Sequence, residues 1–220
     1  MGYLRAFIAI EIPHQIQKSL ETVISLLRRE IGIAVRWVPP QNIHLTLKFL
    51  GDISHESVDS LTQILGMEAE TVPSFDIQTG GLGSYPDAKH ARVVWVGVQA
   101  PAELEAIYHK IDSACTRLGF ESEKRNFSPH LTIGRVRQGT SPADKQKIHR
   151  TLETIKIDSL GTARVDSVHL FKSELKRGGA VYTKLSSAPL RSVMLSEAKH
   201  LNQQIGDSSP SAQSDTTTMR

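Results

Sequence analysis

The chain has 220 residues, of which 39% are hydrophobic and 22% charged, a composition that is ordinary for a soluble globular protein. Its formal net charge of +3 suits an anionic ligand but falls short of the dense Lys and Arg tracts of a dedicated duplex-binding protein. The single cysteine, Cys115, excludes an internal disulfide and favours a reducing, cytoplasmic compartment. No stretch approaches the ~18 uncharged apolar residues of a membrane span, and the N-terminal residues have no signal-peptide pattern. We therefore expect neither secretion nor a membrane partner.

The first half of the chain alternates strand-like and helix-like patterns. Residues 4–12 are rich in β-branched and apolar types, and Pro13 follows at a position where a helix accepts proline. Apolar residues then recur at helical spacing from Ile16 to Leu27, and Gly32 is expected to end the helix. The pattern predicts, in order, a strand at 4–12, a helix at 13–30, a strand at 44–50 closed by Gly51, a helix at 54–69 and a strand at 74–78.

The second half repeats this order. It predicts a strand at 91–98, a helix at 101–118 that ends at Gly119, a strand at 130–136, a helix at 141–154 and a strand at 163–172. Pro13 and Pro101 are 88 positions apart and His44 and His130 are 86 apart, so the two halves keep nearly constant register. We therefore predict an α+β fold built by internal duplication, with two antiparallel sheets that face a central cleft and helices on the outer faces.

Residues 1–190 are predicted to form this single bilobal domain. Within it, the segment 80–85 (GGLGSY) is expected to be a flexible loop, because no strand-to-helix context follows that would make it a phosphate cradle. Residues 191–220 are expected to be a largely disordered tail with at most a short helix at 193–203, since the sequence is polar and rich in turn formers from Gly206 onwards. Cys115 lies on the apolar stripe of the helix at 101–118 and is predicted to be buried.

One tripeptide occurs twice in this plan, as His44-Leu45-Thr46 and as His130-Leu131-Thr132. In a strand each His points to the same side as the Thr two residues later, while the intervening Leu points into a core. Each copy therefore presents one imidazole and one hydroxyl on a single surface. The approximate two-fold symmetry is expected to place the two copies across the cleft from each other.

Two histidines at one cleft suit a reaction that needs an acid and a base together, because the imidazole exchanges protons near neutral pH. In-line attack of water on phosphorus with departure of an alkoxide is such a reaction. The hydroxyls of Thr46 and Thr132 could then hydrogen-bond the non-bridging oxygens. The other seven histidines have no such partner in the sequence and are interpreted as ordinary surface or core residues.

Two basic residues follow the motifs on the same strands. Arg135 could stabilise charge on the phosphorus centre, but strict alternation puts it on the face opposite His130, so that a bulge or strand end at Gly134 is required. Lys48 is four residues after His44, so strand alternation puts it on the same face, and it is expected to border the site.

The motifs and their surroundings resemble a known family. RAFIAIEIP, VRWVPPQNIHLTLKFLG, PHLTIGRVR and GGAVYTKL are similar to the RNA 2',3'-cyclic phosphodiesterases of the 2H phosphoesterase superfamily, historically called 2'-5' RNA ligases, over about residues 3–187. The resemblance implies a bilobal α+β fold, no metal and no cofactor. It also implies hydrolysis of a 2',3'-cyclic phosphate, on RNA ends or nucleotides, to a 2'-phosphate, by a protein expected to be a monomer.

The resemblance also implies roles for individual residues. His44 corresponds to the general acid that protonates the departing 3' oxygen and His130 to the general base that activates water, while Thr46, Thr132 and Arg135 fall on phosphate-contacting positions. Weaker candidates for the edge of the cleft, for which packing is an equal alternative, are Arg36, Phe127 and Tyr182. One departure from the family pattern is Ser84-Tyr85-Pro86, where a phenylalanine commonly precedes the proline.

Three alternatives remain open at this level. The same site could join RNA through a 2'-5' bond if a ribose 5'-hydroxyl replaced water. A binding module could hold a nucleotide or RNA end without turnover, although Arg or Lys would serve anion binding better than two histidines. Metal ligation by the histidines is disfavoured, because no Asp, Glu or Cys lies at ligand spacing beside either motif. The near-symmetry also leaves the acid and base labels interchangeable.

Overall fold

The computed structural model describes residues 2–177 and 179–192. Within them, nine strands form one antiparallel sheet in the order β7-β4-β5-β6-β3-β1-β8-β9, with β2 also paired to β6. The elements, in chain order, are β1 (Tyr3–Glu11), α1 (His14–Ile31), η1 (Gly32–Ala34), β2 (Val35–Trp37), η2 (Pro40–Asn42), β3 (His44–Ser54), α2 (Glu56–Ala69), β4 (Phe75–Tyr85), β5 (Val93–Gln99), α3 (Ala102–Arg117), β6 (His130–Val136), α4 (Pro142–Thr154), β7 (Ser159–Val165), β8 (Ser167–Lys176) and β9 (Gly179–Pro189).

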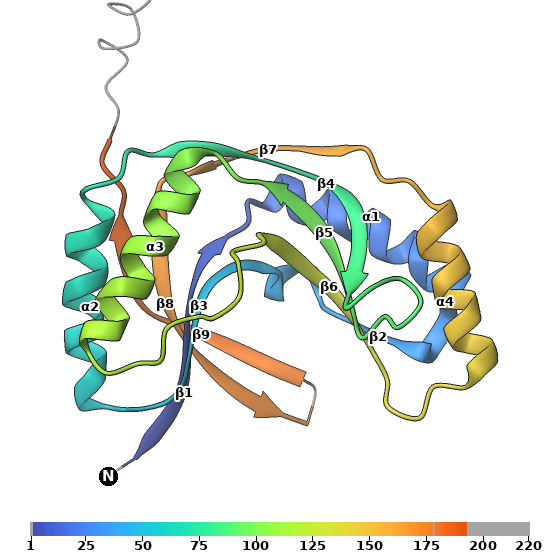
Figure 1. Ribbon diagram of the computed structural model, residues 1–220, viewed down its shortest axis with the longest axis horizontal. Helices are drawn as coiled ribbons and strands as arrows, with labels where there is room; N and C mark the ends of the chain where they lie inside the picture. The colour runs from blue at the N-terminus through green and yellow to red at the C-terminus, as the bar shows by residue number, and fades with distance from the viewer. Residues whose placement is uncertain (1, 178, 193–220) are drawn as a thin grey trace, which may run out of the picture.

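The sheet has two halves, each covered by its own pair of helices. In Figure 1, α2 and α3 lie at one end of the molecule, against β3, β8 and β9, whereas α1 and α4 lie at the other end, against β2, β4 and β7. Each helix pair therefore packs on the outer side of one half, which confirms the predicted α+β architecture with helices outside. The two halves meet edge to edge through β3 and β6, so the two predicted sheets are continuous as one curled sheet.

The two sequence repeats exchange elements between these halves. Helix α1 follows β1 in sequence but packs on the half that contains β7, and α3 follows β5 but packs against β3. In the same way β4, from the first repeat, pairs with β5, while β8, from the second repeat, pairs with β1. Neither half of the sheet is therefore built from one repeat alone.

The helices form where the apolar periodicity predicted them. On α1 the buried residues lie on one stripe from Ile16 to Ile31, and Gly32 ends the helix with a φ of 82°, a conformation that a side chain disfavours. Each large apolar side chain that is buried fully contributes about 1.5–3 kcal/mol, so this stripe is enough to hold the helix on the sheet. Cys115 is buried on α3 as predicted, and burial raises the pKa of its thiol to about 11.

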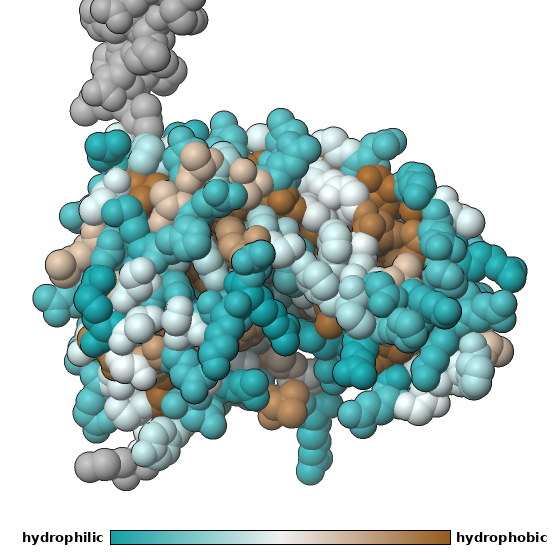
Figure 2. Space-filling view, in the orientation of Figure 1, coloured by the Kyte–Doolittle hydropathy of each residue, from teal (hydrophilic) through white to brown (hydrophobic). Residues whose placement is uncertain are grey.

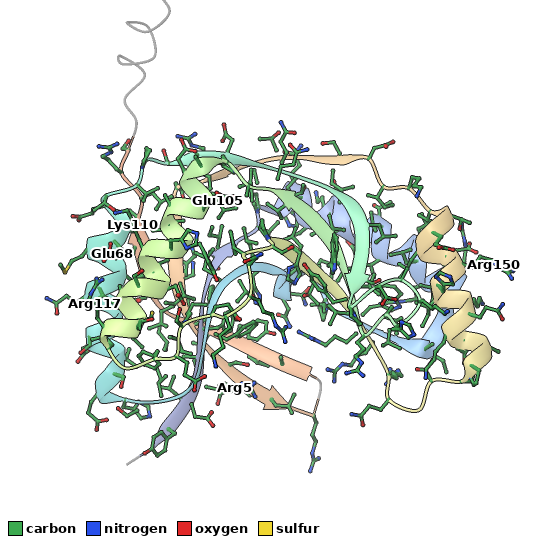
Figure 3. All side chains as sticks on the ribbon, in the orientation of Figure 1. Arg5, Glu68, Glu105, Lys110, Arg117 and Arg150 are labelled. Carbon is green, nitrogen blue, oxygen red and sulfur yellow. The ribbon has the colours of Figure 1, made fainter. Side chains whose placement is uncertain are left out.

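The outer surface is largely polar. Figure 2 shows hydrophilic residues over most of one face, with hydrophobic residues in separate smaller areas. On the outer surface of the helices, an ion pair of 3.0 Å between Arg117 and Glu68 joins α3 to α2 (Figure 3). Among the residues described, no helix combines the length and apolar character that crossing a membrane requires.

Several boundaries differ from the sequence-based expectation. The segment 80–85, expected to be a loop, is the second half of β4, where it pairs with β5. Strand β3 does not end at Gly51 but bulges near it and continues to Ser54. The run at 163–172 is divided at Asp166 between β7, which pairs with β4, and β8, which pairs with β1 and β9 in the other half of the sheet. The expected tail structure beyond Ser192 lies outside the described residues.

The loop prediction failed for an identifiable reason. Glycine usually marks a turn, but in β4 it makes room for neighbours: a Cβ on Gly83 would meet the ring of Trp95 at 2.2 Å, and one on Gly80 would meet the carbonyl oxygen of Asp158 at 2.8 Å. Gly81 is the extra residue of a bulge, with a φ of 72°. These contacts are long-range and have no signature in the local sequence.

Candidate active site

The two histidine motifs are direct neighbours in the sheet. Among the described residues one pair, Leu45 and Leu131, joins β3 to β6, and both leucines are completely buried. Because the strands are antiparallel, His44 lies beside Thr132 and His130 beside Thr46, all on the face opposite the leucines. The two histidines are then diagonal neighbours, roughly 7–8 Å apart between their backbones. This spacing lets two imidazoles reach one small group between them.

Both imidazoles are held in the same way. Nδ1 of His44 donates to the carbonyl oxygen of Asn42 at 2.9 Å, and Nδ1 of His130 donates to the carbonyl oxygen of Ser128 at 2.7 Å. A carbonyl only accepts, so each ring carries its neutral-state proton on Nδ1 and leaves Nε2 for exchange with a ligand. In both cases the carbonyl belongs to the residue two positions before the histidine. The two copies of the motif therefore match in the hydrogen bond that orients the ring as well as in sequence.

His44 lies in an aromatic environment. Its ring stacks on Phe7 with 4.6 Å between centroids, and the edge of Tyr182 approaches at 5.2 Å. Phe171 also packs on Phe7, with 5.3 Å between centroids, and lies 6.5 Å from the His44 ring. Burial among these rings lowers the pKa of His44 to about 4; the Asn42 carbonyl opposes this shift and the positive charge of Arg135 adds to it. His44 is therefore neutral at pH 7 in the unliganded protein.

His130 has aromatic neighbours from the other half. The ring of Tyr85 meets it edge-on at 5.0 Å, and Trp95 lies 6.2 Å away. The hydroxyl of Tyr85 shares a hydrogen bond of 2.8 Å with the hydroxyl of Ser128, the residue whose carbonyl holds the His130 ring. Tyr85 thereby positions His130 both directly and through its supporting loop.

A bulge turns Arg135 to the face of the histidines. Thr132 pairs with Trp95 and Gly134 with Val94, which leaves Ile133 as an extra residue, and Ile133 and Gly134 are both buried. The bulge that Arg135 requires in order to lie on the face of the histidines is therefore present. The influence of the Arg135 charge on the pKa of His44 indicates that the guanidinium lies close to the other motif.

The same bulge recurs in β3 and overturns the expectation for Lys48. Thr46 pairs with Ala9 and Lys48 with Ile8, so Leu47 is the extra residue. Lys48 consequently turns into the core, where it is 5% exposed and pairs with Asp112 of α3. Parity along a strand predicts the face only where pairing is regular, and the bulge reverses it. The position equivalent to Arg135, five residues after the histidine, is held by the exposed Phe49.

The structure brings some of the weaker candidates to the site. Arg36 of β2 is the direct partner of Arg135, so the two guanidinium groups leave the sheet on the same face. Tyr182 touches His44, as described above. Phe127 instead stacks on Tyr108 of α3 at 3.9 Å and packs against the core.

Sequence analysis missed four aromatic neighbours of the histidines: Phe7, Phe171, Tyr85 and Trp95. A cavity of about 290 Å³ opens beside His44, and Glu11, Gln17 and Asn42 are among its lining residues. In the part of the chain that the structure describes, no three His, Cys, Asp or Glu side chains gather as a metal site.

Comparisons with known proteins agree with this arrangement. The model of the 2'-5' RNA ligase superfamily matches residues 15–194. A protein of Methanothermobacter thermautotrophicus named RNA 2',3'-cyclic phosphodiesterase is 29% identical over 83% of this chain and 96% of its own length. A protein of the same name from Methanocaldococcus jannaschii is 31% identical over 81% of this chain and 96% of its own length.

Solved structures give the same result for the fold. The apo form of E. coli LigT superposes with a TM-score of 0.69 at 27% identity, covering 87% of this chain and 99% of that one. The LigT complex with 3'-AMP superposes with a TM-score of 0.67 at 27% identity, over 86% of this chain and 99% of that one. With the family model matched over most of its length and the paired motifs on one face of a curled sheet, this chain belongs to the 2'-5' RNA ligase superfamily.

Proposed function

We propose that this protein hydrolyses 2',3'-cyclic phosphates on RNA ends or nucleotides to 2'-phosphates. The relatives named RNA 2',3'-cyclic phosphodiesterase, and the LigT crystal structures with 3'-AMP and with NADP+, support a nucleotide or RNA substrate. The observation that carries the proposal is the pairing of Leu45 with Leu131, because it sets two imidazoles with exchangeable Nε2 atoms on one face.

In this proposal each imidazole performs one proton transfer. Nε2 of His130 takes a proton from water as the water oxygen bonds to phosphorus, and Nε2 of His44 gives a proton to the 3' oxygen as its bond to phosphorus breaks. The products are a 2'-phosphate and a free 3'-hydroxyl, so atoms and protons balance. The hydroxyls of Thr46 and Thr132 and the guanidinium of Arg135 bind the non-bridging oxygens, where negative charge increases in the transition state.

The acid role of His44 depends on the substrate. With its pKa near 4, His44 carries no proton to donate from Nε2 in the unliganded protein at pH 7. A phosphate anion within a few ångströms favours the charged imidazole and raises that pKa, so substrate binding and protonation of His44 are coupled. Burial among Phe7, Phe171 and Tyr182 strengthens this coupling, because charges interact more strongly away from water.

The test is turnover of adenosine 2',3'-cyclic phosphate, with separation of the 2'- and 3'-phosphate products. We expect 2'-AMP from the wild type, and a loss of kcat of about 10²–10⁴-fold in each of His44→Ala and His130→Ala. His109→Ala, at an exposed position on α3, is the matched control and should retain full activity. Near-normal turnover in either motif variant contradicts the proposed roles.

A further inference from the structure

A second cavity lies on the His130 side of the sheet and has no role in the hydrolysis described above. Its volume is about 380 Å³. We call it the glycine shelf and define it by the residues that matter for its chemistry: Gln78, Gly80, Gly97, Gln99, Asp158 and Ser159. We propose that the glycine shelf is a subsite for a second nucleoside, an inference that rests on the proposed function.

The register of the sheet leads from His130 directly onto the shelf. His130 of β6 pairs with Gly97 of β5, Gly97 pairs with Gly80 of β4, and Gly80 pairs with Ser159 of β7. Directly opposed residues of antiparallel strands share a face, so all four positions lie on the face that carries the His130 imidazole. With strands about 4.8 Å apart, the strand of Gly80 is about 10 Å from His130, a distance that a nucleoside next to the reacting one can cover.

The floor of the shelf is bare backbone. Gly97 and Gly80 place no side chain on it, and each is required by a close backbone approach: a Cβ on Gly97 would meet the carbonyl oxygen of Gly80 at 2.9 Å. The bulge at Gly81 interrupts the regular pairing of β4 with β5 next to this point. The cavity therefore reaches the backbone between the two glycines, and it is bounded there by the Asp158 carbonyl, 2.8 Å from the Cβ position of Gly80, and by the Trp95 ring, 3.6 Å from that of Gly97.

The equivalent positions on the other half are occupied. Glu11 of β1 pairs with His44 as Gly97 pairs with His130. The Glu11 carboxylate is held by Lys184 at 2.6 Å and lies 3.5 Å from Nε2 of His169. The two halves thus differ in their side chains: Glu11 lines the cavity beside His44, whereas a glycine stands at the corresponding position beside His130.

The walls of the shelf fit a nucleoside better than a phosphate. Gln78 and Gln99 are exposed, directly opposed partners, and their amides offer paired donors and acceptors of the kind that recognise the edge of a base. The Asp158 carboxylate and the Ser159 hydroxyl can bond ribose hydroxyls. No Lys or Arg lines the cavity, and the carboxylate would repel a phosphate group.

Two sources could supply this nucleoside. It can be the nucleotide that precedes the cyclic phosphate in the same RNA. It can also be the end of another RNA, whose 5'-hydroxyl would attack in place of water from the His130 side; the 5'-oxygen–phosphorus bond would form, the 3'-oxygen–phosphorus bond would break, and the protons would move through His130 and His44 as in hydrolysis. The shared requirement is a base and a ribose on the shelf.

The variant Gln78→Ala/Gln99→Ala tests the shelf, because both side chains are exposed and neither is placed in the hydrolytic machinery. The double variant Gln63→Ala/Gln146→Ala removes two exposed glutamines from the helices and is its matched control. Turnover of adenosine 2',3'-cyclic phosphate, which carries the reacting nucleoside but no second one, should stay within twofold of the wild type in both. If the wild type does not turn over this compound, the proposed function fails, whatever the shelf does.

Two reactions and one binding measurement, each compared between the shelf variant and the wild type, test the subsite itself. A dinucleotide with a terminal 2',3'-cyclic phosphate should lose at least fivefold in kcat/KM in the shelf variant if the preceding nucleotide uses the shelf. Formation of 2'-5' adenylyl-adenosine from adenosine 2',3'-cyclic phosphate and adenosine should fall at least fivefold if a separate RNA end uses it. Calorimetric titration with a dinucleoside 2'-phosphate, and with adenosine in the presence of 2'-AMP, gives the same comparisons without turnover. If the shelf variant and its control match the wild type in all of these, the subsite is refuted.

Discussion

Leu45 and Leu131, the central residues of the two histidine motifs, are partners in adjacent antiparallel strands, and both are completely buried. A residue pair that joins the two halves of the sheet also sets the distance between the two imidazoles. Any change in packing at this pair is therefore transmitted to both histidines at once.

We expect Leu45→Ala to impair activity in addition to stability. The cavity should lower the free energy of unfolding by about 2–5 kcal/mol. Because β3 can then shift relative to β6, kcat of the folded enzyme should fall at least tenfold. Urea unfolding and turnover of adenosine 2',3'-cyclic phosphate measure the two effects. Leu61→Ala, at an equally buried position on α2, should cost similar stability with normal kcat; equal kcat in both variants would show that the leucine pair does not control the site.

The stability of the protein should fall between pH 6.5 and pH 4 because of His44. The unfolded chain binds a proton at this histidine below about pH 6.5, whereas in the folded protein its pKa is about 4, so acidification favours the unfolded state throughout this window. Above pH 6.5 the contribution of His44 to the free energy of unfolding is fully present. At pH 4.5 about 2–3 kcal/mol of it is lost.

His44→Phe isolates this contribution, since a phenyl ring can stack on Phe7 without titrating. Burial also lowers the pKa of His169, so some loss of stability with acidification remains in the variant. Urea unfolding at pH 7 and pH 4.5 should give a smaller difference for His44→Phe than for the wild type. An unchanged difference would mean that His44 is not a buried neutral imidazole.

Replacement of Arg135 should change two separate quantities. Arg135→Gln is expected to lower kcat/KM by about 10²-fold, through loss of a charge-assisted contact to the phosphate. It should also raise the pKa of His44, because the guanidinium charge opposes protonation of that ring. NMR titration of the His44 ring protons follows the second effect in the absence of substrate. Arg150→Gln, on the outer face of α4 (Figure 3), should change neither quantity. A loss of activity with no change in this pKa would place Arg135 away from His44.

The ion pair of the buried Lys48 and the partly exposed Asp112 should behave as a structural element. Lys48→Met leaves the Asp112 carboxylate without its cation and should cost about 3–5 kcal/mol in unfolding free energy. The double variant Lys48→Met/Asp112→Asn removes both charges and should recover most of that loss. Turnover by the folded fraction should be normal in both variants. A reduced kcat with normal stability would instead support the sequence-based view that Lys48 borders the site.

The local pattern of the sequence determined much of this molecule. The helical stripes and their glycine stops predicted α1 and α3 to within a residue or two at most boundaries, because a helix face depends on neighbours three and four positions away. The repeated His-Leu-Thr predicted the leucines in the core and the imidazoles together on one face, since strand alternation depends only on the next residues. The motifs also predicted the family, which the comparisons confirm.

Tertiary structure decided the rest, through contacts that no local window contains. The exchange of α1, α3, β4 and β8 between the halves follows from which apolar faces fit together, and the two repeats carry similar faces. The bulges that turn Lys48 inward and Arg135 outward depend on the pairing strands. The low pKa of His44 arises from rings more than a hundred positions away, Phe171 and Tyr182, which remove water from it only once β8 and β9 are in place. The sequence thus specified the groups that we propose to carry the chemistry. Long-range packing set the charge state of His44 and the cavity on the His130 side, because desolvation and cavity shape are properties of the assembled sheet.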